Sequence, residues 1–475
     1  MKSIKEICFD PRVAVAELAS ARYPGAGDSD NQISDAVARL ARELSWSDER
    51  GPLGGIIPRG ARVLIKPNLV LDKNQGEWGI EPLITHPSLI KAVADAALMA
   101  EPSEVLVGDA PIQSCDFDNL LAITKLGKWA DDLASADPRF KGIRDFRRTT
   151  CNIENGVRIA SEDRQSEERF VLMDLAQNSL LEPITDDQGS FRVTCYDPRL
   201  MAKTHSSGRH QYLVARDVLD ADVIINLPKL KTHKKAGVTC ALKNLIGING
   251  NKEYLPHHRV GGAGSGGDCY PGGSRLKRLL EYSLDRQNMA ASFSEAKLWN
   301  EVATNLNRVL RLAGDAYGTE GSWSGNDTIW RTCLDLNRIL LYGRSDRTLA
   351  DEPQRRVIHL VDAVIAGQGN GPLSPEPLPM KLVVAGQNAA AVDWVGAMLL
   401  GYDPERIPIV RNAFDDFGWP LTGFAPGDIR LVGDLGEGRA SDLLGRYNSG
   451  EDVNHPVGWR DAARHVGAKG AAQSA

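Results

Sequence analysis

The stretch Ala221-Asp-Val-Ile-Ile-Asn-Leu-Pro-Lys-Leu-Lys-Thr-His-Lys-Lys235 decides the fold, because it joins an apolar run to a basic run. Its first six residues are rich in β-branched side chains and end close to a proline, which predicts a buried strand. The basic residues that follow are Lys229, Lys231, His233 and Lys235. Because they alternate, an extended backbone would direct all four to one side. Open α/β sheets bind ligands at the carboxyl ends of their strands, so this stretch predicts a parallel sheet with an anion site at one strand end.

The segment 236–246, directly after the basic residues, is predicted to be a helix. Its N-terminal amides and positive dipole end would favour a phosphate or a carboxylate. A solvated lysine face is the alternative, but a run held between a buried strand and an apolar helix favours anion binding. Cys240 would lie on an early turn of this helix, where a lowered thiol pKa would make it a nucleophile. A small buried cysteine is the alternative that we favour at this position.

The same strand–turn–helix unit recurs along the chain. Strands are expected at 62–66, 104–109, 357–361 and 381–384, with weaker ones at 170–175 and 191–196. One helix is expected to begin after Thr85-His86-Pro87, because proline is favoured in the first turn, and another at Asn388, which can cap it. Alternating strands and helices favour an α/β fold with a mostly parallel open sheet and helices on both faces.

A helical pattern interrupts this alternation from about residue 274 to residue 350. Two apolar stripes at helical spacing predict its helices. The stripes are Leu298, Val302, Leu306, Val309 and Ala313, and Ile329, Cys333, Leu336 and Leu340. We expect an N-terminal helical or irregular extension at 1–60, the first part of the α/β core at 61–273, a helical insertion or lid at 274–350, the C-terminal part of the core at 351–425, and a C-terminal extension with a disordered tail at 426–475.

The charge and composition of the chain exclude several classes of partner. Its 475 residues carry a net charge of −6 with acid and base well mixed, which gives no reason to expect nucleic acid or an anionic membrane. The N-terminus lacks the apolar segment of a secretory signal, and no run of about 18 apolar residues is present to span a bilayer. We therefore expect a cytoplasmic protein with an anionic small-molecule substrate, and a homo-oligomeric state stays open.

The cofactor is unknown from the sequence. The seven cysteines are scattered without a C-x-x-C pair, which is typical of reduced cytosolic thiols. The same scatter argues against an iron–sulfur cluster held by this polypeptide. A divalent metal stays open, with His257, His258 and Asp268 as weak candidate ligands; the alternative is that one of the two histidines is an acid/base. Two adjacent histidines cannot both face one site on a regular strand or helix, which weakens that set.

Further candidate residues lie where predicted strands and helices meet. Lys66 and Asn68 close the first strand, and a lysine that comes last before proline is expected to point inward rather than into solvent. Asp109 ends the next strand as a general base, a hydroxyl binder or a metal ligand, with an Asp-initiated turn as the alternative. Asn370 lies in a Gly-Asn-Gly-Pro turn whose amides can face a ligand. Asp393 falls in the first turns of a helix, where a carboxylate also favours the dipole.

Taken in order along the chain, these motifs resemble the domain-of-unknown-function-362 family of bacteria and archaea. The motifs are Ile65-Lys-Pro-Asn68, Thr85-His-Pro87, Gly108-Asp109, Asn226-Leu-Pro-Lys-Leu-Lys-Thr-His233, Gly237-Val-Thr-Cys-Ala-Leu-Lys-Asn244, Asp362, Gly369-Asn-Gly-Pro372 and Ala391-Val-Asp393. The resemblance covers roughly residues 60–270 and 355–415, and the Pro-Lys-Leu-Lys-Thr-His and Ala-Leu-Lys-Asn blocks are its most specific parts.

The resemblance implies no assigned chemistry. Some members carry a ferredoxin-like domain with two cysteine-rich iron–sulfur motifs, and this sequence lacks those cysteines. Other members begin with a twin-arginine export signal, which this sequence does not show. The insertion at 274–350 departs from the short form of the family and is expected to shape a substrate pocket specific to a subfamily.

We favour an enzyme that acts on a phosphorylated or carboxylated metabolite, nucleotide- or sugar-linked ones included. Lysines would neutralise the anion and stabilise charge that develops in the transition state, and His233 would transfer the proton because its ordinary pKa is near neutrality. The expected catalytic residues are His233, Lys243, Asp109 and Asp393, and the expected substrate-binding residues are Lys66, Asn68, Lys229, Lys231, Asn244 and Asn370. The reaction class stays open. The alternatives are a redox protein related to iron–sulfur-linked members of the family and a non-catalytic anion-binding protein.

Overall fold

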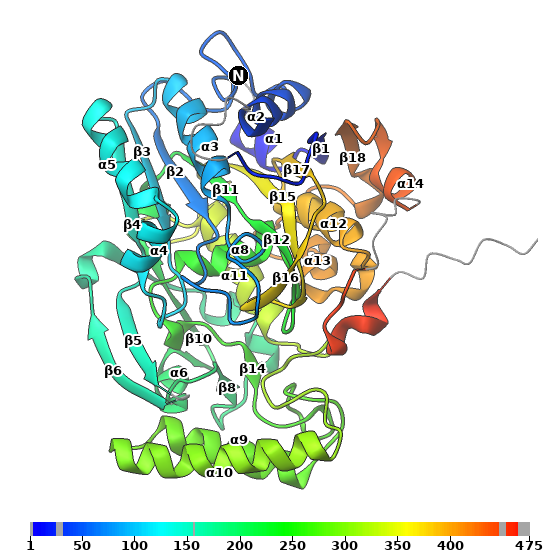
Figure 1. Cartoon of the computed structure of the whole chain (residues 1–475). Helices are drawn as coiled ribbons and strands as arrows, with labels where there is room; N and C mark the ends of the chain where they lie inside the picture. The colour runs from blue at the N-terminus through cyan, green and yellow to red at the C-terminus, as the bar shows by residue number, and fades with distance from the viewer. Residues whose placement is uncertain (1–2, 25–31, 155–156, 446–452, 464–475) are drawn as a thin grey trace, which may run out of the picture.

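A twelve-stranded mixed sheet runs through the middle of the molecule (Figure 1). The structure is a computed structural model that describes residues 3–24, 32–154, 157–445 and 453–463, so the predicted tail lies outside the described residues. Nine strands follow one another across the sheet in the order β19 (Gly438–Arg439), β18 (Arg430–Gly433), β1 (Arg12–Glu17), β17 (Leu382–Gly386), β15 (Arg356–Asn370), β11 (Val223–Leu227), β2 (Arg62–Pro67), β3 (Glu104–Asp109) and β4 (Phe140–Asp145). Three more strands pair with members of this series or with each other: β12 (Lys229–His233), β13 (Gly237–Thr239) and β16 (Ser374–Leu378). The predicted α/β class is confirmed.

The half of the sheet that carries the candidate site is parallel. Neighbouring strands from β15 through β11, β2 and β3 to β4 all pair in parallel. Strand β12 continues the chain just beyond β11 and also pairs in parallel with β15. The carboxyl ends of these strands therefore lie at one edge, where the loops that follow them meet. The other half contains antiparallel pairs, for example between β1 and β17, and two strands outside the nine-strand series, β13 and β16, pair antiparallel with β12 and β15.

Helices cover both faces, because successive strand residues point to opposite sides. Within β2, Val63 and Ile65 belong to one apolar core, while Leu64 belongs to the other. The first core also holds helices α2 (Gln32–Glu43), α3 (Pro87–Met99), α4 (Phe117–Ile123) and α5 (Leu126–Ala136). The second core holds α8 (Ala241–Asn244), α11 (Ile329–Tyr342), α12 (Ala389–Leu399) and α13 (Pro408–Arg411). In the described residues, none of the helices is both long and apolar enough to cross a membrane.

Local sequence signals placed several elements correctly. The main predicted strands correspond to β2, β3, β11, β15 and β17, and the weaker ones to β7 (Phe170–Asp174) and the short β8 (Phe191–Arg192). Helix α3 begins at Pro87, with His86 as its N-cap. The side chain of Asn388 caps α12 by accepting hydrogen bonds from the amides of Ala390 and Ala391. These features depend on neighbouring residues alone, which is why the sequence reveals them.

The predicted helix at 236–246 is wrong. The chain there forms strand β13, the one-turn helix α8 and the 3₁₀ turn η4 (Leu245–Ile248). Gly237 has φ +79°, a left-handed conformation that lets β12 turn back into β13, and a Cβ at this position would lie 2.8 Å from the ring of Trp459. Cys240 is also extended rather than helical. Pairing with β12 therefore overrides the helical pattern of this segment.

The chain termini also take part in the sheet. The first 60 residues, expected to be helical or irregular, contain strand β1, which lies between β17 and β18. The C-terminal segment contributes β18 and β19. Between β4 and β11 the chain forms β5 (Thr149–Glu154), β6 (Val157–Asp163), β9 (His205–Ser206), β10 (Arg209–Ala215), α6 (Pro198–Thr204) and α7 (Arg216–Asp220). Strand β14 (His258–Arg259) pairs with β8 beyond the main sheet.

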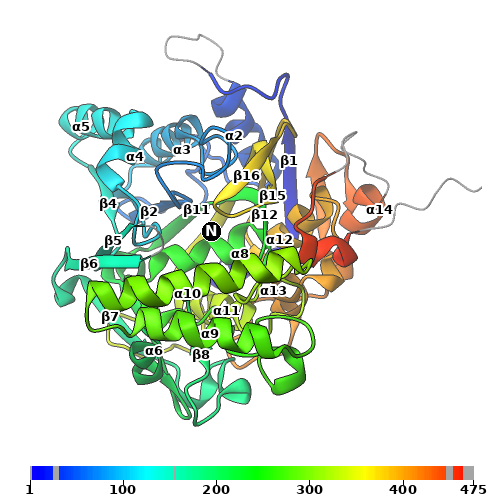
Figure 2. The same ribbon diagram turned by 60° about the horizontal axis from the view of Figure 1, so that its bottom comes forward.

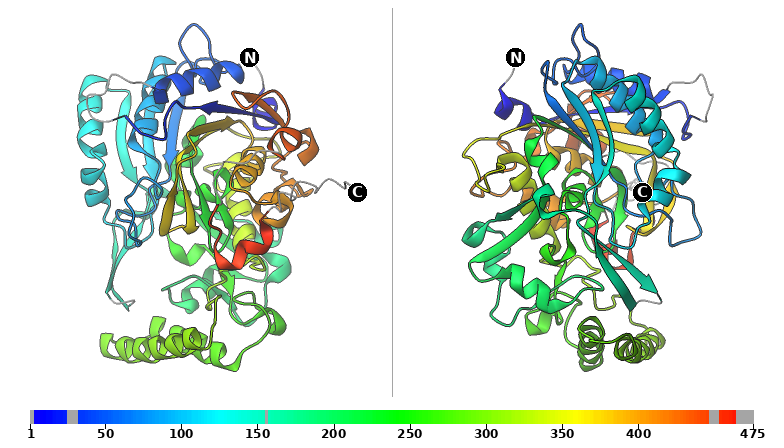
Figure 3. Two further views of the ribbon diagram at one scale, coloured as in Figure 1. Left: turned by 45° about the vertical axis from the view of Figure 1, so that its right-hand side comes forward. Right: turned by 90° about the vertical axis from the view of Figure 1, so that its left-hand side faces the viewer.

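The predicted helical insertion divides into two parts. Helix α11 is buried in the second core, as its apolar stripe predicts. Helices α9 (Arg275–Asn288) and α10 (Phe293–Leu312) instead form a hairpin that lies side by side at one end of the molecule (Figures 2 and 3). The stripe predicted to be the buried face of α10 is wrong in orientation: Leu298 and Val309 are exposed, and α10 packs on α9 through Ala303 and Leu310.

Candidate functional site

A closed ion pair fixes Lys229, the first basic residue of β12. Its Nζ lies 3.1 Å from the Asp362 carboxylate of β15 and donates to the hydroxyl of Tyr23 at 2.7 Å. Tyr23 in turn donates to Asp362 at 2.6 Å and stacks on the ring of His86. Lys229 and Asp362 are both fully buried, so their desolvation is offset by each other and by these hydrogen bonds. The pair ties the N-terminal segment and the start of α3 to the sheet.

A second closed pair lies at the ends of β2 and β3. Lys66 donates to Asp109 at 2.6 Å, to the carbonyl of Pro67 and to the side chain of Asn244. Asp109 also accepts from the backbone amides of Leu69 and Ala110. Burial lowers the pKa of Lys66 and raises the pKa of Asp109, and the contact between the two opposes both shifts. The expected inward lysine is therefore present, and its partner is a carboxylate of the protein.

An amide network connects this pair to the neighbouring strands. Asn244 donates to the side-chain oxygen of Asn226 at 2.7 Å, and Asn226 contacts Nδ1 of His359 at 3.1 Å. Lys66, Asn226 and His359 lie in register on β2, β11 and β15. Burial lowers the pKa of His359 to about 3, so its ring is neutral and accepts from the amide. The network positions α8 over the strand ends.

Basic side chains without matching acids gather next to these two pairs. We call this set the basic cluster; it consists of Lys231, His233, Lys235, Lys243, Lys252 and His257. Lys231 is fully buried and donates to the carbonyls of Leu83 and Pro372. Among the described residues, Lys235 is the one member of the cluster with an ion pair, to Glu320 at 3.5 Å. The solvated lysine face considered from the sequence is therefore wrong, because the β12 lysines and Lys243 are buried.

Lys243 and Lys252 are the least compensated members of the cluster. In the described part of the chain, neither ammonium group has a hydrogen bond or an ion pair with protein. Lys243 is 8% exposed, while Lys252 is partly buried. Burial lowers the pKa of both lysines, and the nearby charge of Lys235 lowers each of them further. A buried ammonium group without a partner is costly, which makes it a place where a bound anion would be stabilised.

The two histidines of the cluster hold opposite tautomers. Nδ1 of His233 accepts from the backbone amides of Lys235 and Ala236, so a neutral His233 carries its proton on Nε2. Nδ1 of His257 donates to the carbonyl of Leu255 at 2.7 Å, which leaves its Nε2 as an acceptor. Burial, followed by the charge of Lys243, holds the pKa of both rings well below its ordinary value. The backbone thus prepares one proton donor and one proton acceptor within a single cluster.

Asp393, another predicted catalytic residue, lies beneath α8. Its carboxylate accepts from the amide of Leu242, the second residue of that helix, at 3.2 Å. Burial raises the pKa of Asp393 to about 7, opposed by hydrogen bonds from Cys240 and Ala241. Cys240 is fully buried, and burial next to Asp393 raises its thiol pKa well above the ordinary value. The favoured buried-cysteine interpretation holds, and the nucleophile interpretation is wrong.

The remaining predicted residues lie outside this cluster. Asn68 follows β2, and its buried side-chain oxygen has no partner within the described residues. Asn370 is exposed at the end of β15. Asp268 accepts from the amide of Arg259 and the hydroxyl of Thr328 and thereby holds the loop before α11. Across the described ranges, no group of three or more histidine, cysteine and acidic residues is placed to hold a metal ion.

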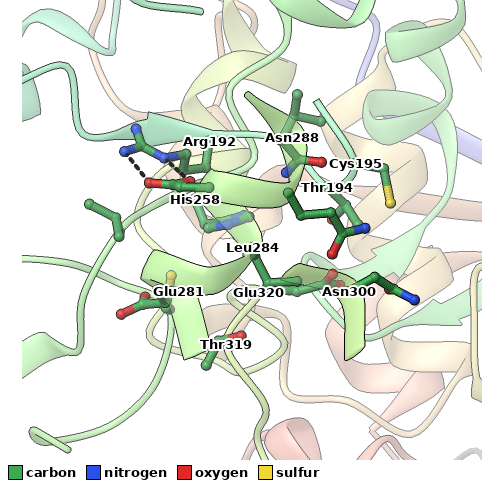
Figure 4. A pocket seen from close by; sticks show the side chains of 15 residues that line it. Arg192, Thr194, Cys195, His258, Glu281, Leu284, Asn288, Asn300, Thr319 and Glu320 are labelled. Carbon is green, nitrogen blue, oxygen red and sulfur yellow. Dashed lines mark hydrogen bonds and ion pairs between the residues drawn. The ribbon is translucent and has the colours of Figure 1, made fainter. Parts of the chain in front are cut away.

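A pocket of about 180 Å³ adjoins the basic cluster (Figure 4). Residues 192–195 and His258 line it from the core, and residues of α9, α10 and the following loop line it from the insertion. Lys235 connects the two features, since it donates to Thr194 at 2.8 Å and contacts Glu320, and both of these residues line the pocket. His258 is buried there with no hydrogen-bond partner for its Nδ1 among the described residues.

Sequence reasoning missed several members of the site. Lys252 and Glu320 were not singled out, and His257 was considered as a metal ligand or, with His258, as one of two candidates for an acid/base. The segment 252–259 was noticeable for its basic residues and paired histidines, which is the signal that could have identified Lys252. Tyr23 and Glu320 carry no local signal, because their roles depend on contacts with residues 339 and 85 positions away in the chain, Asp362 and Lys235.

Comparison with known proteins gives a family, a curated relative and distant structures. The profile of the domain of unknown function DUF362 matches residues 154–398. A thylakoid-associated protein of Synechocystis is 23% identical over 378 residues, which cover 80% of this chain and 75% of that protein. A structural-genomics crystal structure from Thermotoga maritima has a TM-score of 0.35 at 9% identity over 80% of this chain and 60% of its own. The lactate racemase apoprotein of Thermoanaerobacterium thermosaccharolyticum has a TM-score of 0.33 at 12% identity over 84% of this chain and 59% of its own.

We expect Gly247→Ala to destabilise the protein, because a Cβ there would lie 2.0 Å from Oδ1 of Asp109 and 2.6 Å from Nζ of Lys66. Overpacking of this kind costs roughly 1–3 kcal/mol of unfolding free energy. Urea unfolding measures it. Gly427→Ala is the control, since no atom lies within 4 Å of its Cβ position. Equal stability of the two variants would show that Lys66 and Asp109 can move apart to make room for the added methyl group without loss of stability.

We expect the two cluster histidines to be neutral at pH 7 and to differ in tautomer, with Nε2–H on His233 and Nδ1–H on His257. Nitrogen-15 chemical shifts of labelled histidine, assigned with His233→Asn and His257→Gln variants, report both properties. A protonated ring at pH 7, or one tautomer shared by both residues, would remove the donor–acceptor arrangement.

We expect Asp393 to make stability fall as pH rises toward 7. The folded carboxyl keeps its proton up to a pKa of about 7, while the unfolded one releases it near its ordinary value of 3.8. Between these values the folded state binds more protons, so the free energy of unfolding decreases with pH, by at most about 1.4 kcal/mol per pH unit, and levels off above 7. Asp393→Asn should lack this slope in urea unfolding from pH 5 to pH 8. A pH-independent difference between wild type and variant contradicts the assignment.

Proposed function

The chain belongs to the domain-of-unknown-function-362 family, whose profile covers more than half of it, and we propose that it is an enzyme that binds an anionic small molecule at the basic cluster. The anion is a phosphate or carboxylate group of a metabolite, nucleotide- and sugar-linked metabolites included. The chemistry that we propose is proton transfer on the bound molecule.

The observation that carries the proposal is the unpaired ammonium group of Lys243. The chain forms two closed lysine–aspartate pairs close by, so acids are available to its fold at this edge of the sheet. Lys243 nevertheless forms no ion pair and no hydrogen bond with the described residues. The same is true of the ammonium group of Lys252. Breaking up a buried pair typically costs about 3–5 kcal/mol, because a charge is left uncompensated. An anion that binds here would recover that free energy, which favours a ligand site over a structural role.

The proposed proton transfer rests on the two histidines. A neutral His233 with its proton on Nε2 can protonate a reacting atom, while Nε2 of a neutral His257 can accept a proton. The lysine charges, which add to the effect of burial in lowering the pKa of both rings, would also stabilise negative charge that develops on the substrate. A carrier that only binds anions would need the lysines but would gain nothing from opposite tautomers. The histidine geometry therefore favours an enzyme over a carrier.

We assign the other predicted residues to supporting roles. Lys66, Asp109 and Lys229 are saturated by contacts within the protein, so we propose that they hold the strand ends and α8 in place. Asp393 would act through α8 in the same way. The pocket beside Lys235 would take the rest of the substrate, since charged side chains such as Arg192 and Glu281 line it together with amide, hydroxyl and apolar groups.

The cytoplasm is the location that we propose. All seven cysteines are free and none is paired in a disulfide, which suits a reducing compartment. The proposed partner is the anionic metabolite, with neither nucleic acid nor a membrane required. A redox role would need an electron carrier, and the iron content and visible absorbance of the purified protein test that alternative directly.

We expect Lys243→Met to raise the stability of the ligand-free protein and to abolish its response to anions. Removing a buried unpaired charge should add roughly 1–4 kcal/mol of unfolding free energy. Wild-type protein should be stabilised by inorganic phosphate, by about 2.7 kcal/mol at 100 times the dissociation constant, and the variant should not. Thermal unfolding over a phosphate titration, with sodium chloride at matched ionic strength, measures both effects.

Lys203→Met is the matched control, because Lys203 is exposed and outside the cluster. It should behave like wild type in both respects. A phosphate response that survives in Lys243→Met contradicts the anion site. Catalysis is then tested with a panel of phosphorylated and carboxylated metabolites, followed by proton and phosphorus NMR in D₂O. Conversion or deuterium uptake by wild type that is lost in His233→Asn supports an enzyme. Binding with neither conversion nor deuterium uptake supports a carrier.

A further inference from the structure

The outer face of α10 carries a regular apolar seam. Its residues are Leu298, Val302, Asn305, Val309 and Leu312. Their spacing alternates between four and three residues, which is the repeat that lets two helices pack along a shared seam. Five such positions extend over about 21 Å of helix at 1.5 Å per residue. A single-chain surface helix has no need of a second seam of this regularity.

The seam faces solvent and not the hairpin partner. Leu298 is 59% exposed, Val309 is 51% exposed and Leu312 is 82% exposed. The opposite side of α10 already packs on α9 through Ala303, Leu310 and neighbouring residues. Helix α10 thus has two apolar sides, of which the structure of one chain covers one. Exposed leucines and valines in a continuous line mark an interaction surface.

Charges beside the seam complement each other within the same helix. Glu301 and Arg308 flank it on one side, seven residues apart, and both are exposed. Neither forms an ion pair or a hydrogen bond with another described residue. An antiparallel pair of α10 helices centred near Asn305 brings Glu301 of each copy beside Arg308 of the partner subunit. A parallel pair would place Glu301 against Leu306 and form no such contact.

We propose that α10 is a self-association surface, on which the seam packs antiparallel against α10 of a second copy of this chain. The two copies of α10 then lie at the centre of a layer of four helices, with α9 of each copy on its outside. The hairpin lies at one end of the molecule, so two copies can meet through it while their sheets stay apart (Figure 3). This inference does not depend on the proposed anion site.

A polar residue in the centre of the seam favours a second copy over a lipid surface. Asn305 would lie between Val302 and Val309, where a bilayer offers its amide no partner. In a helix pair, one central asparagine specifies register and orientation at some cost in stability. The acidic Glu301 beside it also opposes an anionic membrane, whereas it complements an arginine of the partner subunit.

The test is the oligomeric state of the full chain, measured by sedimentation equilibrium over a wide concentration range. We expect wild-type protein to dimerise reversibly and Leu298→Glu/Leu312→Glu to weaken dimerisation by at least about 100-fold, since an exposed apolar anchor is lost at each end of the seam in both copies. Leu279→Glu is the control: Leu279 is 50% exposed on α9, outside the seam, and its variant should dimerise like wild type. Circular dichroism confirms that each variant is folded.

A charge exchange tests the orientation. Glu301→Arg and Arg308→Glu should each weaken dimerisation by about tenfold, because each places like charges together, and the double exchange should restore it. A wild-type protein that stays monomeric at every concentration overturns the proposal. So does a dimer that is insensitive to the seam substitutions, or binding to anionic vesicles that Leu298→Glu/Leu312→Glu abolishes while wild type remains monomeric.

Discussion

The cost of burying an ammonium group governs the architecture around the strand ends. Desolvating a lysine is expensive unless a carboxylate and further hydrogen bonds replace water. Lys229 meets this requirement through Asp362 and Tyr23, and Lys66 meets it through Asp109. Each pair joins segments that are far apart in the chain, so satisfying the charges also fixes the loops. The N-terminal segment, the start of α3 and helix α8 are held in place as a consequence.

The same cost separates the structural charges from those that we assign to a ligand. Where a lysine has its acid, as Lys66 does, the protein has no further need of an anion. Lys243 and Lys252 both lie near the charge of Lys235 but lack hydrogen-bond and ion-pair partners in the described residues. Burial, followed by this positive charge, holds the pKa of the two cluster histidines well below its ordinary value. The anion binding and the proton transfer that we propose would therefore have one physical origin, an edge of the sheet supplied with more bases than acids.

The helical insertion follows a different rule. Helix α11 belongs to the core, whereas α9 and α10 pack chiefly on each other and reach the core beside the pocket. Two helices that pack on each other cannot bury every side of both. An exposed apolar stripe on such a hairpin therefore either contacts another molecule or has no role in packing. The regular spacing of the α10 seam, with Asn305 at its centre and unpaired opposite charges beside it, favours an outward role. The hairpin would then serve assembly on one side and the substrate pocket on the other.

The sequence by itself determined the elements whose causes are local: the apolar runs of β2, β3 and β11, the caps of α3 and α12, and hence the α/β class and the position of the basic run at a strand end. It also determined that Lys66 points inward, since proline follows it. Only the tertiary structure decided which lysines are paired, because Asp109, Asp362 and Tyr23 come from distant segments. Strand pairing likewise replaced the helix predicted at 236–246, and packing chose the buried side of α10. A sequence pattern specifies that a side chain will be buried, but its partner is set by three-dimensional contacts that local spacing does not encode.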